Sequence, residues 1–149
     1  MMEEKIKSQN LAAIRVRGRT QINSKVESTL RMLRLYKNNY CSLVLNTPNY
    51  VGMLKKIKDY ITWGEIDDET FELLVDKRAE PFNGREEDSK NKIKYNDYMV
   101  VHNKKIKKYF RLSPPRKGFE RKGLKYSYQN GGALGYRGKY INDLIKRML

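Results

Sequence analysis

Cysteine and histidine are almost absent from this chain, with Cys41 and His102 the only examples among 149 residues. A single cysteine excludes a disulfide within the chain and a cysteine-rich zinc site. A single histidine excludes a cluster of histidine metal ligands, and a lone histidine is usually a structural or surface residue. We therefore expect no metal and no cofactor, and a reducing compartment, the cytoplasm.

Long hydrophobic runs are also missing. The runs are short, such as Leu43-Val44-Leu45, and fall far short of the roughly twenty apolar residues that a membrane-spanning helix requires. The N-terminal sequence MMEEKIK has no apolar signal region. These absences predict a protein that neither enters a membrane nor is exported.

Acidic residues are scarce beside basic ones. The chain has 17 Asp and Glu against 32 Lys and Arg, a net charge of +15 and a pI near 9.9. Such a chain repels its own copies and attracts polyanions, so we expect a nucleic-acid partner and no homo-oligomer. Residues 1–59 and 103–149 carry positive surpluses of eight and twelve, whereas residues 60–88 carry a negative surplus of seven. One side of the molecule should face phosphate, and the other should face solvent or a basic neighbour.

Local patterns predict alternating strands and helices in the first half. Residues 11–17 alternate as a strand, and the S-x-x-E spacing of residues 24–27 predicts a capping box that starts a helix at Ser24. Residues 41–46 form a second predicted strand. Thr47 and Pro48 then suit the N-cap and first position of a second helix.

The second half of the chain gives a mixture of clear and ambiguous predictions. Residues 60–66 indicate a third strand, and residues 109–112 indicate an edge strand that ends before two prolines. Residues 79–93 indicate a mobile surface loop, while residues 95–102 fit a helix or a strand equally well. Residues 139–149 indicate an amphipathic helix. The acids at 67–69 suit a helix start better than a Mg²⁺ site of a nuclease, so we expect no enzyme.

The segment 110–139 holds six of the ten glycines, two of the four prolines and eight basic residues against the single acid Glu120. Proline and glycine oppose a helix here. Basic residues that alternate with aromatic ones offer charges for phosphates and flat faces for bases. We predict an extended arm that becomes ordered on folded RNA. A disordered basic linker is the alternative, against which the many aromatic residues argue.

Candidate RNA-binding residues lie on the first strand, at its exit and along the arm. Arg137, placed between glycines and beside Tyr136, is also a candidate for stacking on an unpaired base. The predicted RNA-binding set is Arg15, Arg17, Arg19, Arg111, Arg116, Lys117, Phe119, Arg121, Lys122, Lys125, Tyr136, Arg137 and Lys139.

Several of these stretches resemble one known family. STLRMLRL (28–35), NTP (46–48) and GMLKKI (52–57) are similar to the core of the universal large-subunit ribosomal protein thirty, whose eukaryotic counterpart is protein seven. FRLSPPRKGF (110–119) and GGALGYRG (131–138) resemble the C-terminal extension of its archaeal and eukaryotic members. Bacterial members of the family lack this extension, so the resemblance is to members of the archaeal type.

The resemblance implies an α+β fold: a small ferredoxin-like two-layer sandwich with a β-α-β-α-β core, a largely antiparallel sheet in strand order 3-1-2 and helices on one face. Strand–helix–strand connections alone would instead predict parallel neighbours. The resemblance also divides the chain, as one domain, into a core (about 9–78), a variable loop (about 79–107) and an RNA-binding extension (about 108–149).

The function implied is a structural constituent of the large ribosomal subunit that binds and stabilises rRNA. Its partners would be large-subunit rRNA, with 5S rRNA as a further candidate, and neighbouring ribosomal proteins. The alternative is a non-ribosomal basic protein that binds nucleic acid or acts as an RNA chaperone.

Overall fold

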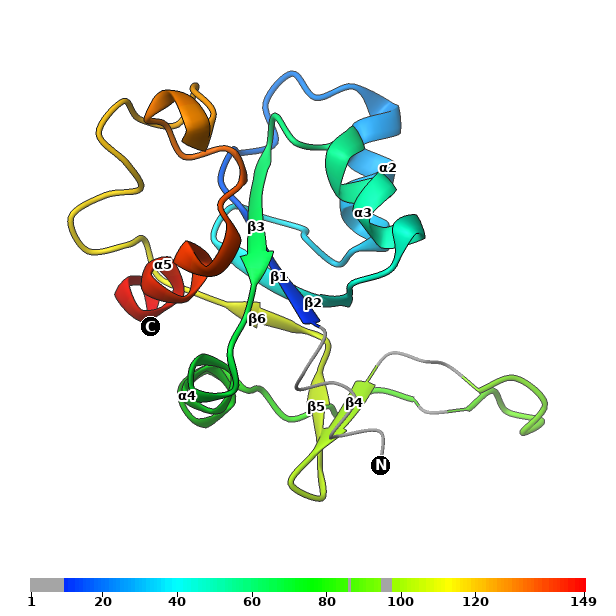
Figure 1. The fold of residues 1–149 in the computed structure, drawn as a ribbon. Helices are drawn as coiled ribbons and strands as arrows, with labels where there is room; N and C mark the ends of the chain where they lie inside the picture. The colour runs from blue at the N-terminus through cyan, green and yellow to red at the C-terminus, as the bar shows by residue number, and fades with distance from the viewer. Residues whose placement is uncertain (1–9, 86, 95–97) are drawn as a thin grey trace.

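The computed structural model describes residues 10–85, 87–94 and 98–149. Among these residues, the main sheet contains five strands in the order β6-β2-β1-β3-β7 (Figure 1). Three pairings are antiparallel, and only that between β3 and β7 is parallel. The strands are β1 (Asn10–Arg15), β2 (Tyr40–Leu45), β3 (Ile61–Glu65), β6 (Tyr109–Arg111) and β7 (Gly135–Tyr136). The mixed α+β class is thus confirmed.

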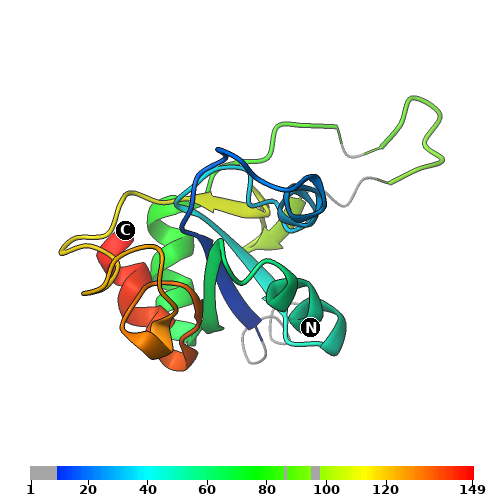
Figure 2. The same ribbon diagram turned by 90° about the horizontal axis from the view of Figure 1, so that it is seen from above.

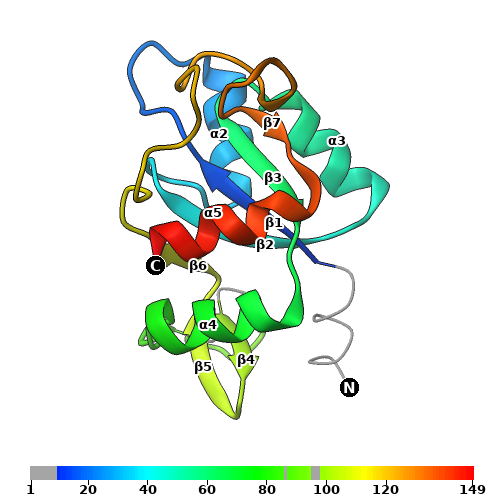
Figure 3. The same ribbon diagram turned by 60° about the vertical axis from the view of Figure 1, so that its left-hand side comes forward.

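Helices cover both faces of this sheet (Figures 2 and 3). Leu11 and Ala13 of β1 pack with one pair of helices, and Ala12 and Ile14 pack with the other pair. Because successive strand residues point to opposite faces, a strand buried along its whole length must be covered twice. The first pair gives the expected layer of helices on one face of strands in the order 3-1-2, but the second pair adds a third layer, so the two-layer expectation is wrong for the chain as a whole. The first pair is α2 (Ser24–Met32) and α3 (Pro48–Lys56), and the second is α4 (Asp68–Arg78) and α5 (Ile141–Met148).

The antiparallel pairing of β1 and β2 across a helix has a simple geometric cause. Ile14 pairs with Cys41, so β2 begins at the same end of the sheet at which β1 finishes. Residues 16–23 and 33–39 lead into and out of α2 at that end. The chain thus leaves the sheet and returns to the same end, so the connection is not a crossover between parallel strands.

Helix starts follow local capping. The Thr47 side chain accepts a hydrogen bond from the Tyr50 N–H, which confirms the predicted start of α3. α2 begins at Ser24 as predicted, but its N-cap is Asn23, whose side chain accepts from the Lys25 N–H at 3.0 Å. The predicted capping box is therefore wrong, because asparagine, itself a strong N-cap, occupies the preceding position.

Residues 98–107 form a separate hairpin below the main sheet (Figure 1). Its strands are β4 (Tyr98–Val101) and β5 (Lys104–Lys107). His102 and Asn103 between them both have positive φ, as a two-residue hairpin turn requires. Residues 98–101 are thus a strand, whereas 95–97 lie outside the described residues. Isolated bridges also pair residue 81 of the predicted loop 79–93 with residue 106, and residue 87 of that loop with residue 94.

The C-terminal segment folds back onto the body. As predicted, β6 is an edge strand, no α-helix forms in residues 110–139, and a buried helix, α5, ends the chain. Two 3-10 turns, η1 (Tyr128–Asn130) and η2 (Gly138–Tyr140), flank β7. Ala133 and Leu134 are buried against Val16. The arm is therefore packed against the body, which corrects the expectation of an extended segment, and the expectation that RNA orders it stays a prediction.

Candidate nucleic-acid interface

Arg15 is one of the predicted RNA-binding residues, and the structure places it inside the protein. It is 1% exposed. Its Nη1 donates to the carbonyl oxygens of Leu35 and Tyr36 at 2.9 and 3.0 Å, and its Nε and Nη2 reach the carbonyls of Arg17 and Gly18. Burial lowers the pKa of Arg15. This arginine joins the exit of β1 to the turn after α2, which corrects the prediction that it contacts phosphate.

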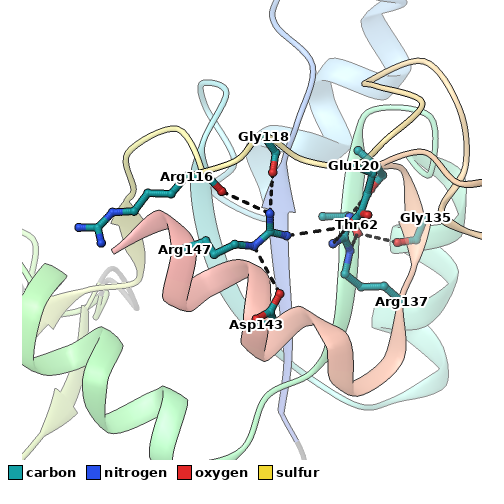
Figure 4. Close-up of polar contacts among 9 residues, drawn as sticks. Thr62, Arg116, Gly118, Glu120, Gly135, Arg137, Asp143 and Arg147 are labelled. Carbon is teal, nitrogen blue, oxygen red and sulfur yellow. Dashed lines mark hydrogen bonds and ion pairs between the residues drawn. The ribbon is translucent and has the colours of Figure 1, made fainter.

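Arg137 is buried as well, with 3% exposure. Its Nε donates to Thr62 Oγ1 at 2.7 Å, its Nη1 to Glu120 Oε1 at 3.0 Å and its Nη2 to the Ala133 carbonyl at 2.8 Å (Figure 4). The guanidinium carbon lies 4.8 Å from the centre of the Tyr128 ring. Burial lowers the pKa of Arg137, and Glu120 opposes this effect. The predicted stacking on an unpaired base is corrected, because a ring of the protein already occupies that role.

The other basic residues predicted in the arm itself are exposed. The segment turns repeatedly, with positive φ at Lys117, Gly118 and Gly123, so its long side chains project outward. Glu120 is the only acid between residues 104 and 142, and it faces Arg137. The exposed charged side chains of the arm are therefore all positive, namely Arg116, Lys117, Arg121, Lys122, Lys125 and Lys139.

Two further predicted residues lie beside the arm, in the loop after β1. The burial of Val16 against Ala133 and Leu134 sets this loop against the arm, and both lie at one end of the sheet in Figures 1 and 3. Arg19 is exposed, and the half-buried Arg17 lies over the Tyr60 ring at 5.3 Å. Folding thus brings together basic residues that are about a hundred positions apart in sequence.

Arg111 is set apart from this group. It lies on β6, at the opposite edge of the main sheet from β7. Its Nε forms an ion pair with Glu80, which Lys107 also contacts at 3.1 Å. Burial alone would raise the pKa of Glu80, but hydrogen bonds from Arg111 and Lys107 outweigh it and lower that pKa. Part of the charge of Arg111 is therefore neutralised within the protein.

The aromatic residues of the arm, like its basic residues, include some that pack within the protein and some that are exposed. Phe119 is half-buried and packs against two apolar clusters, so its flat face serves the fold. Tyr136 is 48% exposed, and its hydroxyl donates to Glu65, which raises the pKa of Tyr136. Tyr126 and Tyr140 are 56% and 59% exposed and were missing from the predicted set. The signal for both was present, since each directly follows a lysine of the arm.

Residues weighed for catalysis have structural partners. Asp67 caps α4 by accepting from the Thr70 N–H at 2.7 Å. His102 is exposed and lies 2.8 Å from Glu72. Among the described residues, no group of three or more His, Cys, Asp or Glu side chains is placed to hold a metal ion. In that same part of the chain, no helix is both long and apolar enough to cross a membrane.

Comparison with known proteins gives one consistent family. The model of the family described as ribosomal protein L30p/L7e matches residues 11–61. The chain is 42% identical over 149 residues to large ribosomal subunit protein uL30 of Methanopyrus kandleri, covering 90% of this chain and 100% of the relative. The uL30 proteins of Nanoarchaeum equitans and Thermoplasma volcanium are 42% and 43% identical, each over 93% of this chain and over 97% and 92% of their own lengths.

Proposed function

This chain belongs to the L30p/L7e family of ribosomal proteins, and from that premise we propose that its arm holds ribosomal RNA. The resemblance found in the sequence is confirmed. The chain is a structural constituent of the large ribosomal subunit and acts there in the cytoplasm, in translation. Its partners are therefore rRNA and the neighbouring ribosomal proteins.

The proposed contact region is what we call the arm surface. One observation supports this assignment: Arg15 and Arg137 are buried and the acid Glu120 pairs with Arg137, while Arg19 and the other basic residues predicted in the arm are exposed. Such a surface neutralises phosphates and releases their counterions. Tyr126 and Tyr140, both exposed, add rings for stacking on unpaired bases. The arm surface consists of Arg17, Arg19, Arg116, Lys117, Arg121, Lys122, Lys125 and Lys139.

Salt dependence tests this proposal. If the purified chain neutralises about six phosphates of large-subunit rRNA, log K should fall against log salt with a slope of roughly −4 to −5. The triple variant Arg121→Gln, Lys122→Gln, Lys125→Gln should make the slope shallower by about 2 to 3. A flat response of the unmodified chain would refute the proposal.

A matched control is available in the loop before β4, which projects away from the arm (Figure 2). Lys90, Lys92 and Lys94 are exposed, and their replacement by glutamine removes the same charge from a different part of the molecule. This control should leave the salt slope unchanged. Substitution is preferable to deletion of the arm, because deletion would also remove the buried residues Ala133 and Leu134.

The alternative is a general basic protein that binds nucleic acid or acts as an RNA chaperone. Competition separates the two: duplex DNA should displace rRNA from a general binder but not from a protein built for one rRNA site. Labelled chain should also sediment with large subunits. Using 5S rRNA as a second competitor would show whether it belongs to the contact.

We further propose that the β1-α2-β2-α3-β3 unit is a core of ferredoxin-like character spanning about 9–78. Residues 79–107 would then be a variable insertion and 108–149 an extension, all within one domain. The order of these elements supports this division. We also propose that the chain has no catalytic activity. RNA cleavage with Mg²⁺ that Asp68→Ala abolishes would contradict that.

A further inference from the structure

Glu120, the one acid of the arm, lies between two arginines (Figure 4). Its Oε1 is 3.0 Å from Arg137 Nη1 and 3.9 Å from Arg147 Nη2. The Glu120 side chain is 28% exposed and that of Arg137 only 1%. An ion pair this well shielded from water is screened less by salt than one on the surface.

The two arginines connect Glu120 to different parts of the fold. Arg137 donates to Thr62 of β3, and the Thr62 hydroxyl in turn donates to the Gly135 carbonyl at 2.9 Å. Glu120 is thereby linked to the sheet edge where β7 pairs with β3.

Arg147 makes the second connection, from α5. Its Nη1 donates to the carbonyl oxygens of Gly118 at 2.7 Å and Arg116 at 3.4 Å. Its Nε faces Asp143 Oδ2 at 3.3 Å, an ion pair rather than an aligned hydrogen bond. The start of the arm is thus tied to a helix whose apolar side lies in the core.

Backbone hydrogen bonds close the arm around this cluster. The N–H groups of Lys122, Ala133 and Leu134 donate to the carbonyls of residues 131, 123 and 126 at 3.0 to 3.1 Å. The exposed Lys122 and Lys125 therefore project from a closed loop rather than from a free chain. These backbone hydrogen bonds, together with the ion pairs of Glu120 with Arg137 and Arg147, determine where the arm surface presents its charges.

We propose that Glu120 is a positioning residue for RNA binding, which with Arg137 and Arg147 holds residues 116–137 folded before RNA is bound. This rests on the function proposed above. A segment that must be ordered during binding lowers the affinity, whereas a prefolded one avoids that loss. Glu120 would thus strengthen binding to an anion although it is itself an anion.

The proposal predicts a change in rRNA affinity on Glu120→Gln that is opposite in sign to the change that electrostatic attraction alone would give. Glu120→Gln removes a negative charge from a basic surface, so attraction to phosphate alone would tighten rRNA binding. If Glu120 holds the arm, the same change should weaken binding, by about tenfold. Glutamine keeps the size and an acceptor oxygen, so the core should remain folded.

Two measurements on the full chain test the proposal. In hydrogen exchange without RNA, the amides of Lys122, Ala133 and Leu134 should exchange faster in Glu120→Gln than in the unmodified chain, while those of β1 should not change. In rRNA binding across a salt series, affinity should fall with an unchanged slope, because no phosphate contact is removed. Glu120→Asp, which keeps the charge, should recover part of the affinity.

Glu27→Gln is the matched control, with the same change of charge on α2, at a side chain that is 38% exposed. It should leave arm exchange unaltered and binding equal or slightly tighter. Unchanged arm exchange in Glu120→Gln, or binding that tightens as in the control, would overturn the proposal. If the unmodified chain fails to bind rRNA, the proposed function is refuted. The hydrogen-exchange data would still show separately whether Glu120 holds the arm folded.

Discussion

The carbonyl oxygen of Gly138 occupies the space that a side chain on Gly64 would need. A Cβ built on Gly64 would lie 1.9 Å from that oxygen and 3.0 Å from the Cβ of Ile141. Gly64 lies within β3, next to its last residue, and a glycine inside a strand costs stability unless another backbone comes very close. Here that backbone is η2, so the absence of one side chain lets the end of the arm and the start of α5 lie against the sheet.

Gly64→Ala should therefore destabilise the protein by about 2 kcal/mol or more, because the opposing atoms are backbone and cannot rotate away. Urea unfolding followed by circular dichroism would measure this. Gly52→Ala is the control: nothing lies within 4 Å of its Cβ position in α3, so alanine should stabilise the helix by about 0.5–1 kcal/mol. Equal effects of the two substitutions would mean that the close contact at Gly64 does not exist.

Features governed by neighbouring residues could be predicted from the sequence. Thr47 followed by Pro48 correctly located the start of α3, because capping depends on a few adjacent groups. The apolar spacing of residues 141–148 likewise indicated the buried face of α5. The same local reasoning failed at Ser24 only because two good N-cap residues stand side by side.

Features that depend on distant parts of the chain could not be predicted. Nothing local to Arg15 shows that carbonyl groups of residues 35 and 36 will surround it, and a buried arginine is rare without such partners. Arg137 likewise needs Thr62, which is 75 positions away. Folding also decided that α5 covers the second face of the sheet, and this overturned the two-layer expectation.

The burial of Arg15 predicts a role in stability and not in RNA binding. Arg15→Lys keeps the charge but loses the fork of donors, so it should destabilise the fold by about 2 kcal/mol. Arg15→Gln, which also removes the charge, should destabilise the fold and still leave the slope of rRNA binding against salt unchanged. Arg19→Lys, at an exposed position, should leave stability unchanged. A variant at Arg15 that is fully stable yet binds rRNA with a shallower slope would restore the original RNA-binding assignment.

The capping hydrogen bond of Asp67 can be distinguished from the charge effect of its neighbour Asp68. Asp67→Ala should lower the free energy of unfolding by about 1 kcal/mol, because the Thr70 N–H loses its acceptor at the start of α4. Asp68→Ala removes only a favourable charge near the helix dipole and should cost a few tenths of a kcal/mol. Thermal unfolding of both variants makes the comparison, and a larger loss at Asp68 would contradict the cap.

Glu80 should contribute to acid sensitivity. Hydrogen bonds from Arg111 and Lys107 hold the pKa of Glu80 in the folded chain below its unfolded value of about 4.3. A carboxylate with a lowered folded pKa stabilises the fold above the unfolded pKa, and this contribution is lost as the pH falls through the folded pKa. Unfolding measured from pH 6 down to pH 2 should therefore show a smaller loss of stability in Glu80→Gln. Parallel curves for the two proteins would argue against the pairing of Glu80 with Arg111 and Lys107.

Cys41 should make the stability of the fold depend on pH in the alkaline range. It is completely buried in β2, and burial raises the pKa of its thiol to about 12. The unfolded thiol ionises near pH 8.5, so the raised folded pKa predicts that stability falls as the pH rises above this value. A thiol reagent should accordingly label the native chain only through unfolding, at a rate that increases with urea. Cys41→Ala should lose less stability than the unmodified chain between pH 8 and pH 10, and rapid labelling of the native chain at neutral pH would show that the thiol is not buried.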